Sequence, residues 1–298
     1  MEFSISLQPD EEGYTGRECP ACEKYFKIKF GTGLPGDVDA HCPYCNHIGP
    51  HKEFFTKQQI EYAHSVVLNK VSNDFHNAMK KLERKPDRNQ FVSIGITVKG
   101  NPIPITHYSE TELEEKITCD CCTLQYAIYG VFGFCPDCGI HNSKQMLDAN
   151  FELILKMLEF ASTADKAIAD RLIENAIEDA ISSFDGFGRE ICNGTIKVIS
   201  FQNIEAASKR LLEVQGLDIA NGVDVEDWQF VKEQFQKRHL LAHRMGVIDE
   251  EYQRKTNGDT SMIGRKVSIT TDDVERLIRH LRTISNTLFT GISVVTGN

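Results

Sequence analysis

The chain lacks long apolar runs, a basic amino terminus and an excess of positive charge. No apolar run reaches the roughly 20 residues of a membrane-spanning helix, and residues 1–4 begin neither a basic region nor an apolar signal core. We therefore expect a cytoplasmic protein without membrane segments. The formal net charge is −10 and the isoelectric point is about 5.5. This balance argues against broad, non-specific nucleic-acid binding, so any RNA contact must use local basic patches.

Cysteine, in contrast, is plentiful. Eight of the ten cysteines in the 298 residues fall into four Cys-x2-Cys pairs. Such pairs present two thiolates to one metal ion, and they indicate zinc in a reducing compartment rather than disulfides. Cys121 is an alternative ligand to Cys119. The two-residue spacing between Cys119 and Cys122 favours Cys119, because it allows backbone N–H groups to turn toward the sulfur. Cys192 stands alone and is expected in a core as a small hydrophobe.

The pairs form two complete four-cysteine sets. The first set encloses residues 23–41, a nineteen-residue gap that fits a zinc ribbon, and the second encloses residues 123–134, a gap of twelve. Sulfur fills all four tetrahedral positions, which leaves none for substrate or activated water, so both zinc ions should be structural. The predicted ligands are Cys19, Cys22, Cys42 and Cys45 in the first set, and Cys119, Cys122, Cys135 and Cys138 in the second.

The surroundings of the first set leave two alternatives open. A histidine could replace a cysteine ligand, and three lie nearby: His41, His47 and His51. The basic and aromatic residues in the stretch 24–29 could form either a nucleic-acid surface or a solvated face of the ribbon. The complete cysteine sets favour four sulfur ligands in each case.

A connector separates the two sets. Apolar residues recur three or four apart over residues 57–83, which predicts a helix that ends in the basic cluster 80–85 before Pro86. That cluster either complements the helix dipole or contacts phosphate. Two strand-like runs follow, over residues 91–99 and 103–108.

The rest of the chain has helical periodicity. We predict helices over residues 151–160, 165–184, 203–214 and 225–243, and a last helix that starts at Thr271 or Asp272 with Asp272 and Glu275 as a capping box. Four to five helices around one core make a bundle. The predicted buried face of the last helix is Val274, Leu277, Ile278, Leu281, Ile284 and Leu288. Arginines elsewhere on it, Arg276, Arg279 and Arg282, are either solvated or an RNA-facing rim.

A short stretch from Arg238 to His243 ends the helix over residues 225–243. His239 and His243 are four apart and share a face, and Arg238 can reach the same cleft. Imidazoles move protons near neutral pH and arginine grips phosphate, which suits phosphodiester chemistry. The alternative interpretation is structural: positively charged side chains at the C-terminal end of a helix interact favourably with the helix dipole. The predicted buried stripe of this helix is Trp228, Val231, Phe235 and Ala242.

These residues resemble the signature of the HEPN superfamily: Arg, then a polar residue, then His four to six residues on. The resemblance covers about residues 151–298. It implies a dimeric helical domain, and many members are metal-independent RNases of toxin, phage-defence and CRISPR systems, whereas others only bind RNA. The stretch 184–189 also resembles the end of an early helix in several HEPN groups, which would bring Asp185 or Arg189 near the cleft. Met245 stands where one subgroup has a target tyrosine, so that mechanism does not carry over.

The resemblance implies an endoribonuclease that cuts RNA in a groove between two copies. His243 would take the proton from a ribose 2′-hydroxyl or protonate the leaving 5′-oxygen, Arg238 would stabilise charge on phosphate, and His239 would orient or share the proton. A neutralising or regulatory protein is a possible partner. The alternatives are a catalytically silent RNA- or protein-binding module and a zinc-ribbon regulator of transcription.

These predictions combine into a multidomain α+β protein. We expect a zinc ribbon over residues 1–56, a connector helix with short strands and a second ribbon over 57–143, and an all-α HEPN-like bundle over 144–298.

Overall fold

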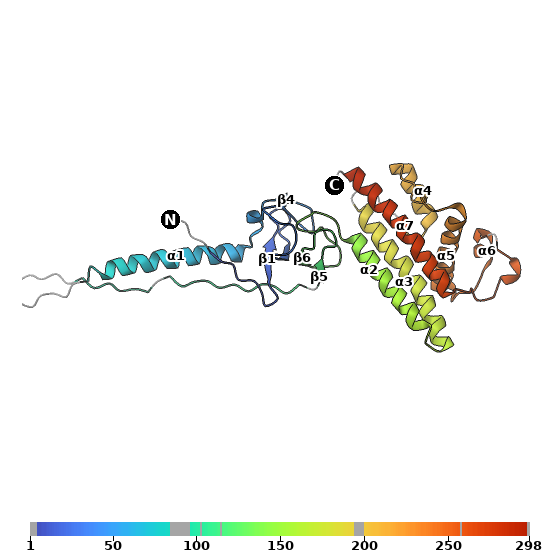
Figure 1. The fold of residues 1–298 in the computed structure, drawn as a ribbon, viewed down its shortest axis with the longest axis horizontal. Coiled ribbons are helices and arrows are strands. Elements are labelled where there is room, and N and C mark those ends of the chain that lie inside the picture. The colour runs from blue at the N-terminus through green and yellow to red at the C-terminus, as the bar shows by residue number, and fades with distance from the viewer. Residues whose placement is uncertain are drawn as a thin grey trace, which may run out of the picture. The chain divides into compact units, whose positions relative to one another are not determined.

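The computed structural model describes residues 5–83, 96–101, 103–113, 115–193, 200–256 and 258–296, with side chains to residue 292. The chain divides into two compact units, Met1–His141 and Asn142–Asn298. A small antiparallel sheet region precedes most of the helices, which confirms the α+β layout at this level (Figure 1). None of the helices in the described ranges has the length and apolar character to cross a bilayer.

The strands of the two predicted ribbons join one sheet. Strands β1 (Tyr14–Glu18), β2 (Tyr25–Lys29), β6 (Gln125–Ile128) and β5 (Glu115–Thr118) lie in that order, and every neighbouring pair is antiparallel. A two-stranded hairpin is marginally stable alone. Pairing β2 with β6 lets both hairpins bury one face in a common core. The two predicted modules therefore belong to one unit, and residue 56 is not a boundary between them.

The unit contains an internal two-fold repeat. Strands β3 (Ala40–His41) and β4 (Ile48–Gly49) flank one cysteine pair, and the bridge between Phe134 and His141 flanks its counterpart. The His41 N–H donates to the Pro136 carbonyl at 2.7 Å, and the Phe134 N–H donates to the Pro43 carbonyl at 2.8 Å. These reciprocal bonds join the two halves.

Helix α1 (Lys57–Lys80) follows the short 3-10 turn η1 (His51–Phe54). Its first turn has a capping box, in which Thr56 accepts from the Gln59 N–H at 3.1 Å and the Gln59 side chain accepts from the Thr56 N–H. The predicted strand over residues 103–108 is wrong: this segment runs as extended chain along α1 without sheet partners among the described residues. The other predicted strand, over 91–99, lies mostly outside the described residues.

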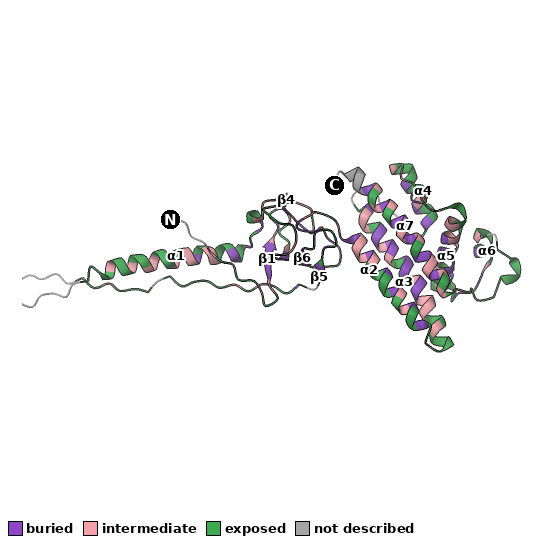
Figure 2. Ribbon diagram, viewed as in Figure 1, coloured by how far each residue is buried: buried purple, intermediate pink, exposed green. Residues whose placement is uncertain are grey.

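The second unit is helical: α2 (Ser143–Ala161), α3 (Lys166–Cys192), α4 (Ile204–Gln215), α5 (Val225–Arg244), α6 (Glu250–Thr256), the 3-10 turn η2 (Thr260–Met262) and α7 (Thr271–Thr296). Helix α3 contacts α2, α5 and α7. Their inward faces form one apolar core, coloured purple in Figure 2. The whole predicted buried face of α7 lies in it, as does Cys192.

Helix α3 extends eight residues beyond the predicted end at residue 184, through Gly186 and Gly188. A Cβ on Gly188 would lie 2.5 Å from the Phe201 ring, whereas a Cβ on Gly186 would meet nothing within 4 Å. Gly188 therefore lets the Phe201 ring pack directly against the helix backbone. Glycine lowers intrinsic helix propensity, and this packing overrides it.

Two details of the predicted helices are wrong. The capping box of α7 is formed by Thr270 and Asp273, which exchange bonds of 3.0 and 3.1 Å, because Thr270 is the residue directly before the helix. Ala242 is exposed, since the end of α5 buries Leu240 instead, against Ile248 and Tyr252.

Candidate metal centres and the Arg238–His243 site

All four cysteine pairs lie on turns with the same backbone pattern. In each, the N–H of the first cysteine donates to the carbonyl five residues on, and its carbonyl accepts from the N–H four residues on; the first cysteines are Cys19, Cys42, Cys119 and Cys135. The residue four positions on has positive φ each time: Glu23, Asn46, Thr123 and Gly139. Backbone N–H groups also point at sulfur, as from Ala21 to Cys19 Sγ at 3.4 Å.

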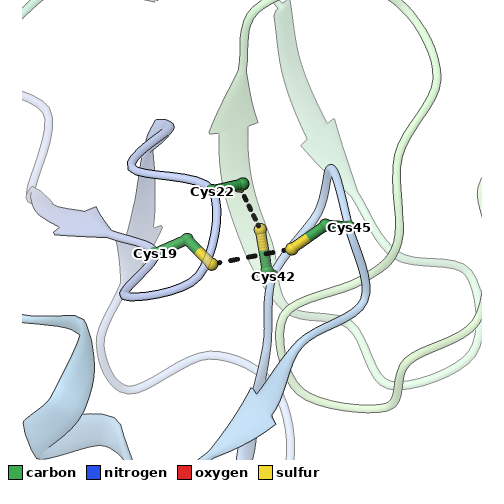
Figure 3. A group of neighbouring side chains, drawn as sticks. All are labelled: Cys19, Cys22, Cys42 and Cys45. Atoms are coloured by element: carbon green, nitrogen blue, oxygen red, sulfur yellow. Dashed lines mark hydrogen bonds between the residues drawn. The ribbon is translucent and has the colours of Figure 1, made fainter.

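These turns bring the eight predicted ligands together in two groups, and within each group the Sγ atoms lie within 4.8 Å of one another. Figure 3 shows the first group, where Cys19 faces Cys45 and Cys22 faces Cys42, each with Sγ atoms 3.7 Å apart. In the second group, the corresponding distances are 3.7 Å for Cys119–Cys138 and 3.4 Å for Cys122–Cys135. A tetrahedron with metal–sulfur bonds of about 2.3 Å has edges of about 3.8 Å. The residues fit a four-coordinate metal ion.

The chemistry of the second group also fits a cation. Burial raises the pKa of Cys135 and raises that of Cys138 to about 12. Thiols buried this way stay protonated by themselves, and a divalent cation stabilises their thiolate forms. Cys121 is exposed and lies outside the group. His41, His47 and His51 belong to neither group; His41 Nδ1 lies 3.0 Å from Asn46 Oδ1.

The stretch 24–29 does not form a continuous nucleic-acid surface. Phe26 is fully buried, and Lys27 is buried with its Nζ 2.7 Å from Asp10 Oδ2. Lys24 and Lys29 lie over the rings of Tyr44 and Tyr14. Strand alternation turns Phe26 toward the core, and Lys27 ends up covered because β2 is a central strand.

His239 and His243 lie on one exposed face near the end of α5, with ring centroids 4.6 Å apart. Arg238 is half-buried, and its Nη1 donates to Gln202 Oε1 at 3.2 Å. Its Nε is buried without a hydrogen-bond partner among the described residues. Arg238 and His243 are five residues apart, about 140° around the helix axis. The structure therefore brings the two imidazoles together but places Arg238 on a neighbouring face.

Asp185 organises the segment that holds Arg238. Its buried carboxylate accepts from the Phe201 N–H at 2.6 Å and the Gln202 N–H at 3.2 Å, and Arg189 Nε donates to it at 2.9 Å. This network connects α3, through Gln202, to the guanidinium of Arg238. Asp185 and Arg189 are thus linked to Arg238 through Gln202, and the Asp185 carboxylate accepts hydrogen bonds from backbone N–H groups.

Positively charged groups lie near His239. Desolvation of its ring lowers the pKa of His239, and the charges of His243 and Lys255 lower it further. A lowered pKa leaves the imidazole neutral at pH 7, the form that accepts a proton. Lys255 Nζ is itself paired with Glu251 at 2.9 Å, and Arg244 lies 3.7 Å from Asp249.

The predicted arginine rim on α7 is mostly engaged within the unit. Arg276 binds Asp227 and lies over the Phe230 ring, and Arg282 reaches Glu152 at 2.5 Å. Gln202 is the residue that sequence reasoning missed. It lies 36 residues before Arg238, and nothing in the sequence around an exposed glutamine indicates this contact.

Comparisons of this chain with known protein families, with curated proteins and with solved structures return no match.

Proposed function

We propose that the helical unit is a metal-independent endoribonuclease of the HEPN type, belonging to the class of toxin or phage-defence effectors. The observation that carries this proposal is the exposed His239–His243 pair with its rings in contact, directly after an arginine whose guanidinium is held at the surface by Gln202. Two imidazoles can share the two proton transfers of RNA transesterification, and a guanidinium can stabilise charge on the phosphoryl oxygens.

The reaction needs no redox partner or water. A neutral imidazole, His243 in this proposal, takes the 2′-hydroxyl proton as the 2′-oxygen forms a bond to phosphorus. The bond from phosphorus to the 5′-oxygen breaks, and His239, once it has received the proton from His243, gives it to that oxygen. The products carry a 2′,3′-cyclic phosphate and a 5′-hydroxyl. His239, with its lowered pKa, supports the transfer by exchanging a proton with His243.

The site requires two copies of the helical unit. Arg238 and His243 lie on different faces of one helix, so Arg238 of one copy would complete a site with His243 of the other copy across a two-fold axis. The four-sulfur groups take no part in the chemistry. They would hold zinc structurally, because a saturated sulfur shell leaves no position for substrate.

Cleavage of total RNA in EDTA, measured before chelation removes metal from the four-sulfur groups and followed by mapping of the product ends, tests this proposal. Arg238→Ala and His243→Ala should each abolish cleavage with little change in melting temperature, and His239→Ala should reduce it less. Arg210→Ala, at an exposed arginine on α4, is the matched control and should cleave normally. Cleavage by the His243→Ala protein at the wild-type rate would refute the assignment.

Mixing the two inactive variants tests the composite site. If Arg238 and His243 come from different copies, random exchange should restore about a quarter of wild-type activity, since half of the dimers keep one of two intact sites. A site within one copy would leave the mixture inactive. If no RNA is cut by the wild-type protein, RNA binding by the Arg238→Ala protein distinguishes a silent RNA-binding module from a regulator that does not bind RNA.

A further inference from the structure

The two sulfur groups differ in their exposure to solvent, although equivalent turns build them. In the first group, Cys45 is exposed and Cys22 is half-buried. In the second group, the equivalent fourth ligand, Cys138, is half-buried and the other three ligands are buried. A dissolved reagent therefore reaches one ligand of the first group directly, whereas none of the second group's ligands is exposed.

The longer gap of the first cysteine set shields the second group. Its glycine-rich loop, residues 31–36, packs onto the last turn of that group: the Leu34 N–H donates to Asp137 Oδ2 at 2.9 Å, and a Cβ on Gly33 would clash with the same oxygen. Asp137 is 8% exposed and directly precedes Cys138. The twelve-residue gap of the second set has no loop of this length, so it gives the first group no equivalent cover.

A bound metal ion would keep the Cys45 sulfur in its reactive form. The thiolate, and not the thiol, is the nucleophile that attacks peroxides and other electrophiles. A sulfur that coordinates a metal ion is deprotonated by it. Cys121 is also exposed, but it belongs to neither group, so a metal ion in either group does not stabilise its thiolate. Among the eight predicted ligands, only Cys45 combines exposure with a position in a metal-binding group.

We propose that Cys45 is a modification site for peroxides, through which the first group loses its metal ion before the second. The Cys45 thiolate attacks hydrogen peroxide: a sulfur–oxygen bond forms, the oxygen–oxygen bond breaks, and the leaving hydroxide takes a proton from solvent. The Cys19 thiolate, whose Sγ lies 3.7 Å away, then attacks the Cys45 sulfur (Figure 3). The disulfide forms as a second hydroxide leaves and is protonated. Two thiolates are thus oxidised to one disulfide, and hydrogen peroxide is reduced to two water molecules.

The disulfide leaves the first group without enough ligands to hold a metal ion. Cys22 and Cys42 supply only two of the four positions that a structural zinc site fills. Strand β2 begins three residues after Cys22 and pairs with β6, so loss of this metal ion reaches the other half of the sheet. Oxidation of one exposed sulfur therefore loosens the whole sheet unit.

Zinc release from the full-length Cys121→Ser protein tests the order of the two groups. Hydrogen peroxide is added to the zinc-loaded protein, and a chromogenic chelator too weak to take zinc from the untreated protein records the zinc that leaves. One equivalent should leave at least about 10-fold faster than the second, because a buried sulfur reacts only after local opening. Peptide mapping after the first equivalent should find Cys19 joined to Cys45. Release of both equivalents at one rate, or a first disulfide within the second group, would overturn the proposal.

Histidine variants separate reactivity at Cys45 from a general weakness of the first group. Histidine is a zinc ligand that forms no disulfide, so Cys45→His should keep two zinc ions and slow the fast release by at least about 10-fold. Cys138→His, at the equivalent position of the second group, is the matched control and should leave the fast release unchanged. A fast release that persists in the Cys45→His protein would refute the role of Cys45.

Alkylation of the wild-type protein decides the same question if the Cys45→His protein binds only one zinc ion. N-Ethylmaleimide should modify Cys45 before any of the other seven ligands, and one zinc ion should leave with that modification. Cys121 serves as the internal reference for an exposed thiol outside the groups. Modification of Cys122 or Cys135 before Cys45 would show that exposure does not set the order of reaction, and the proposal would fail.

Discussion

The two units reach a stable core by different means. In the main core cluster of the first unit, five of the thirteen buried residues are cysteines, whereas the core of the helical unit contains one cysteine among twenty-five. The first unit is held by short strands and four turns that converge on two sulfur groups. The second is held by long helices with continuous apolar faces. We infer that the stability of the first depends on metal and that of the second on apolar burial.

Removing the metal should produce the largest difference between the units. Structural zinc contributes about 10–16 kcal/mol of binding free energy to comparable small domains, so chelation should unfold the sheet while α2 to α7 stay folded. Hydrogen exchange followed by mass spectrometry reports both units in one sample, and metal analysis should give two ions per chain. A global loss of protection, in the helices as well, would contradict this independence.

Replacing one cysteine of a sulfur group tests whether the two halves of the sheet depend on each other. Because β2 pairs with β6, Cys19→Ser should increase exchange in β5 and β6 although their own ligands are intact. Cys121→Ser is the matched control, since Cys121 is exposed and outside both groups. Unchanged exchange in β6 of the Cys19→Ser protein would mean that each half of the sheet stands alone.

Two glycines of α3 test how tightly the helical core is packed. Gly188→Ala should destabilise the helical unit by about 1–3 kcal/mol, because its Cβ meets the Phe201 ring. Gly186→Ala should stabilise it by about 1 kcal/mol through helix propensity, since nothing obstructs its Cβ. Thermal unfolding should show a lower melting temperature for Gly188→Ala and a higher one for Gly186→Ala. Equal effects would show that Phe201 can move aside.

The smallest effect concerns the turns of the sheet unit. Thr123 adopts φ of 65°, a conformation that disfavours a β-branched residue by about 1 kcal/mol or more. Thr123→Gly should therefore raise the free energy of unfolding of the first unit by up to about 1 kcal/mol. The greater conformational entropy that glycine gives the unfolded chain offsets part of this gain. Gly139→Ala, at the equivalent turn, should lower it, because its Cβ would also meet His41. Chemical denaturation of the metal-loaded protein measures both.

The sequence predicted features that depend on neighbours along the chain. The eight cysteines come together as their spacing indicated, and the apolar periodicity of α7 matches its buried face. The prediction of a strand over residues 103–108 was wrong, because this alternating segment packs against α1 and does not pair with another strand. Of the site, the shared face of His239 and His243 was predictable from the four-residue interval, whereas the bond from Arg238 to Gln202, 36 residues away in sequence, was not.

By itself, the sequence determined the four cysteine-bearing turns, the helical periodicity and the position of the histidine pair, because each rests on interactions within a few residues. Only the tertiary structure decided that the hairpins of the two cysteine sets share one sheet, that α3 continues through two glycines, and that Asp185 holds the segment carrying Gln202. Those outcomes depend on which distant surfaces meet. Burial of apolar area and satisfaction of backbone hydrogen bonds select among such pairings only when the whole chain is folded.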